Sequence, residues 1–199
     1  VKSRNIVRIM GEYKLIDLDA AAKIGKPIGR KYSSAVAPPE FAKLLFTSNG
    51  ESIDELRAMV KPATDVTGNR PEPRQYLEKA SKSFDVWGFG CLFYSLCAGR
   101  PMFGNVDSSD DNIYIPATAK ELMDWDGIDN VRLSFIFQGV DNRDKDFAID
   151  LIKKCLQGDE TKRFKSMTDV LEHPYFNSSA REEIIKQDYA TAPVVGSRG

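Results

Sequence analysis

Four polar residues near the start of the sequence flank one short predicted β-hairpin, and they are Lys2, Asn5, Asp17 and Asp19. Residues 6–16 predict the hairpin, with a turn at 10–13, so both of its ends face the same side. Carboxylate and amide oxygens beside an ammonium group suit a site for Mg²⁺ and phosphate. The alternative is that all four are solvated turn residues, and their spacing alone favours that alternative.

The most apolar stretch, residues 84–103, predicts a central helix. Its apolar residues fall on every side of a helix, which predicts burial on all sides. We expect the helix to open at Asp85 and to stop at Gly99, because glycine suits a helix C-cap. An ionised carboxylate is rarely buried without partners, so Asp85 is expected to be either an N-cap or an anchor for another segment.

The remaining elements are mostly short and helical. Residues 20–37 lack periodicity and predict a loop, and Ser166 is the expected N-cap of a helix that His173 and Pro174 close. Residues 47–81 predict a surface insertion with little core of its own. Residues 177–199 predict a flexible tail with one weakly helical turn. Further helical pieces are expected within residues 41–46, 117–125, 129–137 and 147–156.

Residues 104–116 form an acidic, turn-rich stretch that contains Asp107, Asp110 and Asp111. Three aspartates could bind Ca²⁺, but they lack the regular spacing of a calcium-binding loop. We therefore expect a solvated loop here. His173, the only histidine, is expected to be structural because it sits at a helix end before a proline.

Composition sets the class of protein. The 199 residues carry a formal net charge of -1, which gives no reason to expect a nucleic-acid partner, and no apolar run is long enough to span a membrane. The three cysteines form no CxxC pair and read as reduced core residues of an intracellular protein, cytoplasmic or nuclear. The first residue is Val1, and residues 1–10 look like folded interior, so the chain is expected to be part of a longer protein.

Five motifs in order resemble the C-terminal lobe of a eukaryotic protein kinase, beginning just after the catalytic aspartate. The sequence Val-Lys-Ser-Arg-Asn resembles the end of the catalytic loop, and Lys-Leu-Ile-Asp-Leu-Asp resembles the strand that leads into Asp-Phe-Gly. Pro38, Pro39 and Glu40 stand where Ala-Pro-Glu is expected. Residues 85–90 resemble the central helix of the lobe, and residues 159–163 with 171–176 resemble its closing helices. The resemblance implies a mainly α, kinase-like lobe over residues 1–176, a helical bundle around a buried central helix with a small hairpin.

The resemblance implies roles in ATP and Mg²⁺ binding. Asn5 and Asp17 would bind Mg²⁺, Lys2 would contact the transferred phosphate, and Leu18 would stand for the packing Phe. Val7 would lie in the apolar column beneath the adenine, with Leu92 and Leu96, although plain core packing also explains the two leucines.

The resemblance also implies roles in substrate binding and structure. Lys2 at its position is typical of Ser/Thr kinases, and Ser33 aligns with the residue that completes the Ser/Thr substrate site. Tyr32, Ser33 and Ser34 are candidate phosphosites, or plain loop residues. Structural anchors are implied as well: Glu40 would pair with Arg163, and Asp85 would anchor the backbone of the catalytic loop.

Departures from the family pattern bear on activity. The aspartate that accepts the substrate proton would precede Val1, and the N-terminal lobe, with its Gly-rich loop, strand lysine and helix glutamate, is expected to be a missing partner of this chain. This chain alone is therefore expected to be inactive. Asp19 replaces the glycine of Asp-Phe-Gly, which keeps a pseudokinase or scaffold open as the second hypothesis. The third is an unrelated helical binding domain. The parent reaction would transfer the ATP γ-phosphate to a protein Ser/Thr hydroxyl.

Overall fold

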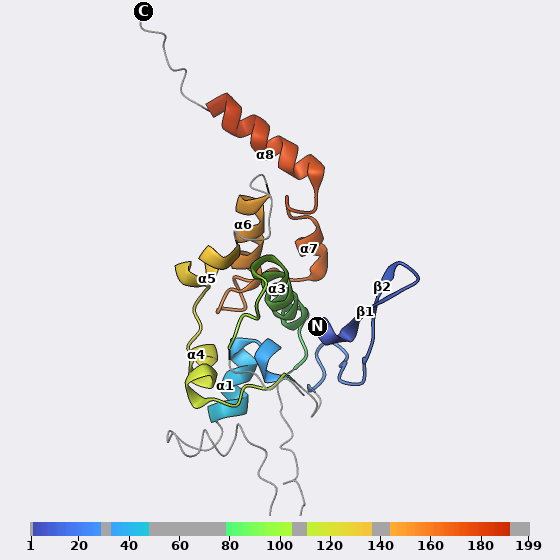
Figure 1. The fold of residues 1–199 in the computed structure, drawn as a ribbon, viewed down its shortest axis with the longest axis vertical. Helices are drawn as coiled ribbons and strands as arrows, with labels where there is room; N and C mark the ends of the chain where they lie inside the picture. Colours follow the sequence, from blue (N-terminus) through green and yellow to red (C-terminus); the bar gives the residue numbers. More distant parts are fainter. Residues whose placement is uncertain (1, 29–32, 48–78, 105–110, 137–143, 192–199) are drawn as a thin grey trace, which may run out of the picture.

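The computed structural model describes residues 2–28, 33–47, 79–104, 111–136 and 144–191, and the fold is mainly α-helical with one two-stranded antiparallel sheet, as predicted (Figure 1). The predicted insertion at 47–81 lies almost entirely outside the described residues. Among the described residues, no helix has the length and apolar character needed to cross a membrane.

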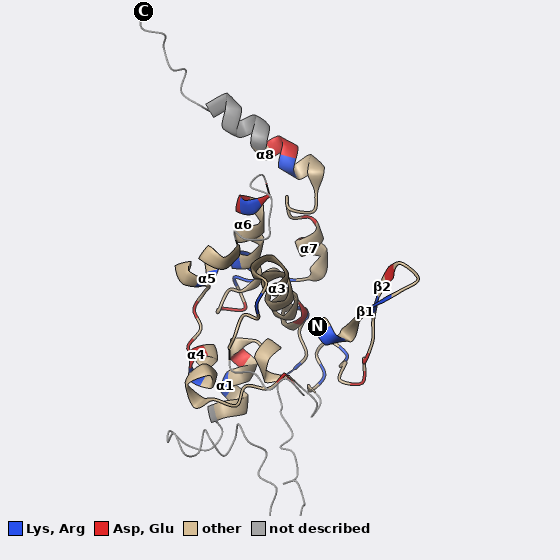
Figure 2. Cartoon of the chain, in the orientation of Figure 1, with Lys and Arg blue, Asp and Glu red and all other residues tan. Residues whose placement is uncertain are grey.

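The central helix is α3 (Lys82–Ala98), which begins three residues before the predicted opening. Its N-cap is Ser81, whose hydroxyl accepts a hydrogen bond from the Ser83 N–H at 3.2 Å, so the prediction of Asp85 as a possible N-cap is wrong. Gly99 ends the helix with φ 67°, as predicted, because glycine takes the left-handed conformation without strain. Beyond Lys82 and Asp85 the helix carries no charged residue, and it is uniformly tan along most of its length in Figure 2.

The hydrophobic core surrounds α3. Helices α6 (Lys145–Cys155) and α7 (Met167–Leu171) pack on it toward one end of the molecule, while α1 (Pro39–Thr47) packs against α4 (Pro116–Met123) toward the other (Figure 1). Helix α5 (Asn130–Phe135) and the short 3-10 helix η2 (Ser34–Val36) complete this body.

Burial of α3 is incomplete. Trp87 and Val86 are fully buried, but the side of the helix that carries Leu96 is open, with Leu96 71% exposed. The prediction of burial on every side is therefore wrong for this chain.

Two tryptophans connect α3 with the segments that follow α4 and α6. The rings of Trp87 and Trp125 meet edge to face, with centroids 5.9 Å apart, and the Trp125 indole N–H donates to the Leu156 carbonyl at 2.9 Å. Gly90 lets α3 approach α6, because a Cβ there would lie 2.8 Å from the Cys155 Cβ.

The sheet consists of β1 (Ile6–Ile9) and β2 (Glu12–Leu15), and it projects sideways from the helical body (Figure 1). Ile6 pairs with Leu15 and Ile9 with Glu12, so the turn consists of Met10 and Gly11. Both turn residues have positive φ, which is the usual conformation of a two-residue hairpin turn. All four β2 residues are exposed.

The chain beyond residue 177 differs from the prediction. Helix α8 (Ser178–Thr191) runs for 14 residues, where one weakly helical turn was expected. Arg181 attaches its first turn to the body through an ion pair with Asp144 at 2.8 Å and through stacking on the Phe147 ring. The predicted N-cap Ser166 is confirmed, because its hydroxyl accepts from the Asp169 N–H at the start of α7.

Candidate active site

The hairpin brings Asn5 and Asp17 to the same end of the sheet. Asn5 ends the short 3-10 helix η1 (Ser3–Asn5), and its carbonyl accepts from the Ile16 N–H at 2.8 Å, which extends the β1–β2 pairing by one step. Asp17 follows directly. The two proposed metal ligands therefore leave the sheet from adjacent strands at its open end.

Asp17 has an unusual backbone conformation, with φ 58° and an exposed side chain. A non-glycine residue in the left-handed region is uncommon, and such residues cluster at functional sites. Asp19 does not share this feature, since Met10, Asp17 and Asp111 are the non-glycine residues with positive φ in the described segments. The backbone strain expected at Asp19, where the family pattern has glycine, is therefore absent.

Lys2 lies where the hairpin meets η2. Its ammonium donates to the Ser33 hydroxyl at 3.0 Å and forms an ion pair with the Asp111 carboxylate at 3.1 Å. The Lys2 side chain is 23% exposed, so solvent screens these contacts only in part. The structure thus brings together Lys2 and Ser33, two of the residues singled out from the sequence.

A small cavity lies beside this contact. It has a volume of about 100 Å³ and lies between Lys2, the η2 residues and the middle of α3. Cys91 lines it, but burial raises the pKa of the Cys91 thiol to about 12, so this thiol is neutral and a poor nucleophile. The cavity can accept a small apolar group beside Ala35 and Val36.

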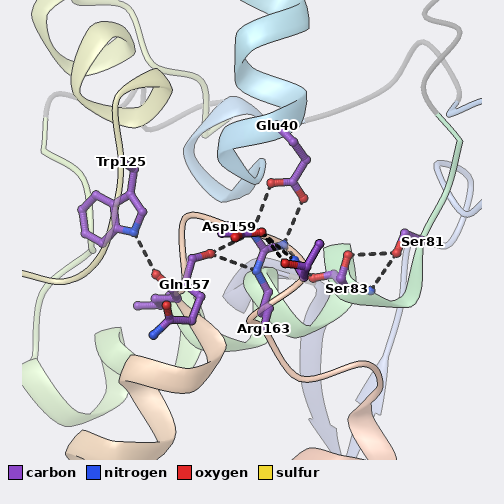
Figure 3. A network of polar contacts seen from close by, with 9 residues as sticks. Glu40, Ser81, Ser83, Trp125, Gln157, Asp159 and Arg163 are labelled. Carbon is purple, nitrogen blue, oxygen red and sulfur yellow. Dashed lines mark hydrogen bonds and ion pairs between the residues drawn. The ribbon is translucent and has the colours of Figure 1, made fainter.

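Glu40 and Arg163 form the ion pair that the resemblance implies (Figure 3). The pair is bidentate, with Arg163 Nη1 3.0 Å from Oε1 and Nη2 3.1 Å from Oε2 of Glu40. The Arg163 side chain is fully buried, and it also donates to the Gln157 and Ser83 carbonyls. This guanidinium therefore joins α1, the first turn of α3 and the segment after α6.

The other predicted residues have varied surroundings. Asp85 is exposed on the first turn of α3, and in the described part of the chain its carboxylate has no hydrogen bond, so its anchoring role stays a prediction. Val7 is half-buried. Tyr32 lies outside the described residues. Ser34 is 3% exposed and its hydroxyl accepts from the Ile113 N–H, so phosphorylation there would require this segment to open.

His173 is structural, as predicted. It is buried, its Nε2 lies 2.8 Å from an Asp150 oxygen, and its Nδ1 accepts from the Tyr175 N–H at 3.1 Å. Both ring nitrogens are thus occupied. Burial raises the pKa of the Asp150 carboxyl, but hydrogen bonds from Lys154 and His173 outweigh it, and the pKa lies below its usual value.

Asp111 is the site residue that the sequence prediction missed. It was expected in a solvated loop, but its side chain is 24% exposed and it contacts Lys2 and Arg4, so that expectation is wrong. Asp107 and Asp110 lie outside the described residues, and the described residues contain no acidic or thiol cluster that could hold a metal. No local pattern singles out Asp111, because its partners are about 110 residues away along the chain.

Comparison with known proteins identifies the family of this chain. Residues 71–176, just over half of the chain, match the family model of the protein kinase domain. The chain belongs to the protein kinase family. The matched segment includes α3 and Arg163, whereas Lys2, Asn5 and Asp17 precede it.

Curated relatives agree. The chain is similar to the probable serine/threonine-protein kinase fhkD of Dictyostelium discoideum, with 35% identity over 48% of this chain and 11% of that protein. It is also similar to the dual specificity protein kinase Ttk of Danio rerio, with 25% identity over 88% of this chain and 14% of that protein. Mitogen-activated protein kinase 14 of Arabidopsis thaliana is 29% identical over 57% of this chain and 35% of its own length. The chain thus spans between about a tenth and a third of these relatives.

Proposed function

We propose that this chain is the C-terminal-lobe part of a Ser/Thr protein kinase that transfers the ATP γ-phosphate to protein hydroxyls. The observation that carries the proposal is the 3.0 Å hydrogen bond from the Lys2 ammonium to the Ser33 hydroxyl. In a kinase site the lysine would contact the transferred phosphate, and the serine would face the hydroxyl that receives it. Their contact supports one site that handles both substrates.

The donor atoms at the hairpin end fit the proposed metal. An Asn amide oxygen and an Asp carboxylate are hard oxygen ligands, which Mg²⁺ prefers, and one or two protein ligands leave room for phosphate oxygens and water. When bound, Mg²⁺ would neutralise the charge that develops on the phosphate. Asn5 and Asp17 would hold it, and the exposed Asp17 side chain is free of burial that would block access.

Lys2 would supply the remaining positive charge. Its ammonium is held by Ser33 and Asp111, so little reorganisation is needed when an anion arrives. Val7 would pack beneath the adenine. The residue that takes the hydroxyl proton is expected to precede Val1, together with the N-terminal lobe as partner, so we propose that the 199 residues alone are inactive.

The cysteines support the proposed location. Cys91, Cys97 and Cys155 are unpaired and buried, which suits a reducing compartment. We propose an intracellular protein, cytoplasmic or nuclear, that acts on protein substrates.

The test uses the protein at its natural full length. We expect Mg²⁺-dependent ATP binding and phosphate transfer to Ser or Thr of a protein substrate, and Asp17→Asn should lower kcat by about 10²–10³-fold. Asp126→Asn, at an exposed aspartate three residues after the end of α4, is the matched control and should leave kcat unchanged. A wild type that neither binds Mg²⁺-ATP nor transfers phosphate would rule out the enzyme and leave the pseudokinase or scaffold.

A further inference from the structure

Asp111 makes contacts that none of the family motifs explains. Its Oδ2 lies 3.1 Å from Lys2 Nζ, and its Oδ1 lies 3.6 Å from Arg4 Nε. Lys2 and Asp111 are both about one-quarter exposed, so their attraction is stronger than that of a surface pair. One carboxylate therefore holds a long, flexible lysine side chain at the candidate site.

The same stretch holds the backbone of the substrate segment. Residues 111–113, which we name the 111–113 strap, form three hydrogen bonds with residues 34 and 35. The Asp111 carbonyl accepts from the Ala35 N–H at 3.1 Å, and the Asn112 side-chain oxygen accepts from the Ser34 N–H at 2.8 Å. In return the Ser34 hydroxyl accepts from the Ile113 N–H at 2.8 Å. Ser33, the partner of Lys2, lies immediately before these two residues.

The backbone of Asp111 is in the left-handed region, with φ 61°. This conformation is disfavoured for a residue with a Cβ and persists where the surroundings hold it. Here the carbonyl is held by Ala35 and the carboxylate by Lys2, so the two contacts on opposite ends of Asp111 fix its conformation.

We propose that Asp111 is a positioning residue of the phosphate-transfer site, whose carboxylate fixes the Lys2 ammonium against Ser33 while its backbone fixes the 33–35 segment. This proposal rests on the proposed function. Lys2 must point at the phosphate and Ser33 must face the acceptor hydroxyl. Asp111 contacts Lys2 directly and helps to hold the segment that carries Ser33.

The first experiment measures steady-state kinetics of the full-length protein. Asp111→Asn removes the charge but keeps the backbone, because Asn also tolerates the left-handed conformation. We expect kcat to fall by about ten- to a hundredfold with KM for ATP nearly unchanged, because Lys2 loses its orientation. Asp111→Glu should recover part of the rate, and Asp126→Asn should have no effect. An unchanged kcat in Asp111→Asn would overturn the proposal.

The second experiment does not depend on activity. A double-mutant cycle on the unfolding equilibrium combines Lys2→Met with Asp111→Asn, and we expect a coupling of about fivefold or more in the equilibrium constant. Hydrogen exchange of the Ala35 and Ile113 amides should also become faster in Asp111→Asn. If the effects of the two changes on the free energy of unfolding are additive, Lys2 and Asp111 do not interact and the proposal is wrong. A wild type that does not transfer phosphate, but in which Lys2 and Asp111 are coupled, would overturn the proposed function and with it the role of Asp111 in phosphate transfer. The contact between the two residues would still stand, so the two failures can be told apart.

Discussion

Arg163 shows how one side chain can connect distant parts of this chain. Its guanidinium is fully buried, with Glu40 on one side, the Trp87 ring 5.1 Å away, and two backbone carbonyls as further acceptors (Figure 3). A buried cation is costly unless hydrogen bonds satisfy its donors. The chain meets that requirement with groups from three segments, so the contact fixes how those segments lie together.

Glu40→Gln tests this arrangement. The change keeps the shape of the side chain but leaves the buried guanidinium without a counter-charge. Because Glu40 is itself 21% exposed, we expect a loss of about 2–3 kcal/mol in the free energy of unfolding, below the roughly 3–5 of a fully buried pair. Urea unfolding measures it. The control is Glu172→Gln at an exposed position, which should change stability by no more than about 0.5 kcal/mol. Equal effects of the two changes would contradict the argument.

Asp159 gives a prediction on pH. Hydrogen bonds from the Thr161 hydroxyl and N–H lower the pKa of the Asp159 carboxyl below its usual value. A lowered folded-state pKa stabilises the fold above the unfolded value, near 3.9, and this stabilisation is lost as pH falls through the folded value. Asp159→Asn keeps an acceptor without the charge, so it should be less stable than the wild type at pH 6. The difference in the free energy of unfolding between the two proteins should narrow below about pH 4.

Urea unfolding of both proteins between pH 6 and pH 2.5 measures this difference. A difference that stays constant over this range would show that the charge of Asp159 contributes nothing to stability.

At the residue scale, sequence reasoning succeeded where a family pattern fixed the partner. Glu40 and Arg163 are 123 positions apart, and only the resemblance connects them. Asp111 had no such pattern, so its contact with Lys2 depended on tertiary structure that the sequence does not show. Ser34 was named as a candidate phosphosite or a plain loop residue, and in the fold it is buried beneath the 111–113 strap.

At the scale of elements, the central helix was predicted from its apolar composition, and its C-terminus from Gly99. Its start was wrong because the apolar pattern begins at Phe84, whereas the cap at Ser81 lies in a polar stretch, Ser81-Lys82-Ser83, that has no periodicity. The length of helix α8 was underestimated for a related reason. Its residues 178–191 have a weak apolar stripe, and their attachment by Arg181 to Asp144 is not visible in a local pattern.

Gly90→Ala tests the contact between α3 and α6. An added Cβ would lie 2.8 Å from the Cβ of Cys155 and 2.8 Å from Cδ2 of Leu156. The leucine can rotate, but the cysteine Cβ is fixed by its backbone, so the helices must separate. We expect a net loss of about 1–2 kcal/mol in the free energy of unfolding, since overpacking outweighs the better helix propensity of alanine.

Gly127→Ala is the control for this change, because nothing lies within 4 Å of its added Cβ. Thermal unfolding of both variants measures the difference. A stabilised Gly90→Ala variant would show that α6 can move away without cost.

At the scale of the whole molecule, exposed apolar residues gather on and beside the hairpin, and Leu96 is exposed on α3. Met10 is fully exposed, and Tyr13, Leu18 and Leu96 are each more than half exposed. A two-stranded sheet without a buried face is marginally stable by itself. The site residues Asn5 and Asp17 therefore flank an element that has little support from the helical body.

Hydrogen exchange of the 199-residue chain tests this difference in stability. We expect the amides of β1 and β2 to exchange faster than those of α3 and α6 by orders of magnitude, because local opening of the hairpin breaks few contacts. Addition of Mg²⁺ should leave the α3 rates unchanged, which provides an internal control. Equal protection of hairpin and core would mean that the hairpin is held by a contact beyond those described.

The pairing of Trp87 with Trp125 has a practical consequence. These are the only two tryptophans in the sequence, and they are 0% and 7% exposed. Indole emission shifts with the polarity of its surroundings, so the fluorescence of this chain excited at the red edge comes entirely from the helical body. The hairpin, whose aromatic residue is Tyr13, is dark under those conditions. Unfolding of the hairpin and unfolding of the helical body can thus be followed separately in one unmodified sample. Hydrogen exchange reports the first, and tryptophan fluorescence reports the second.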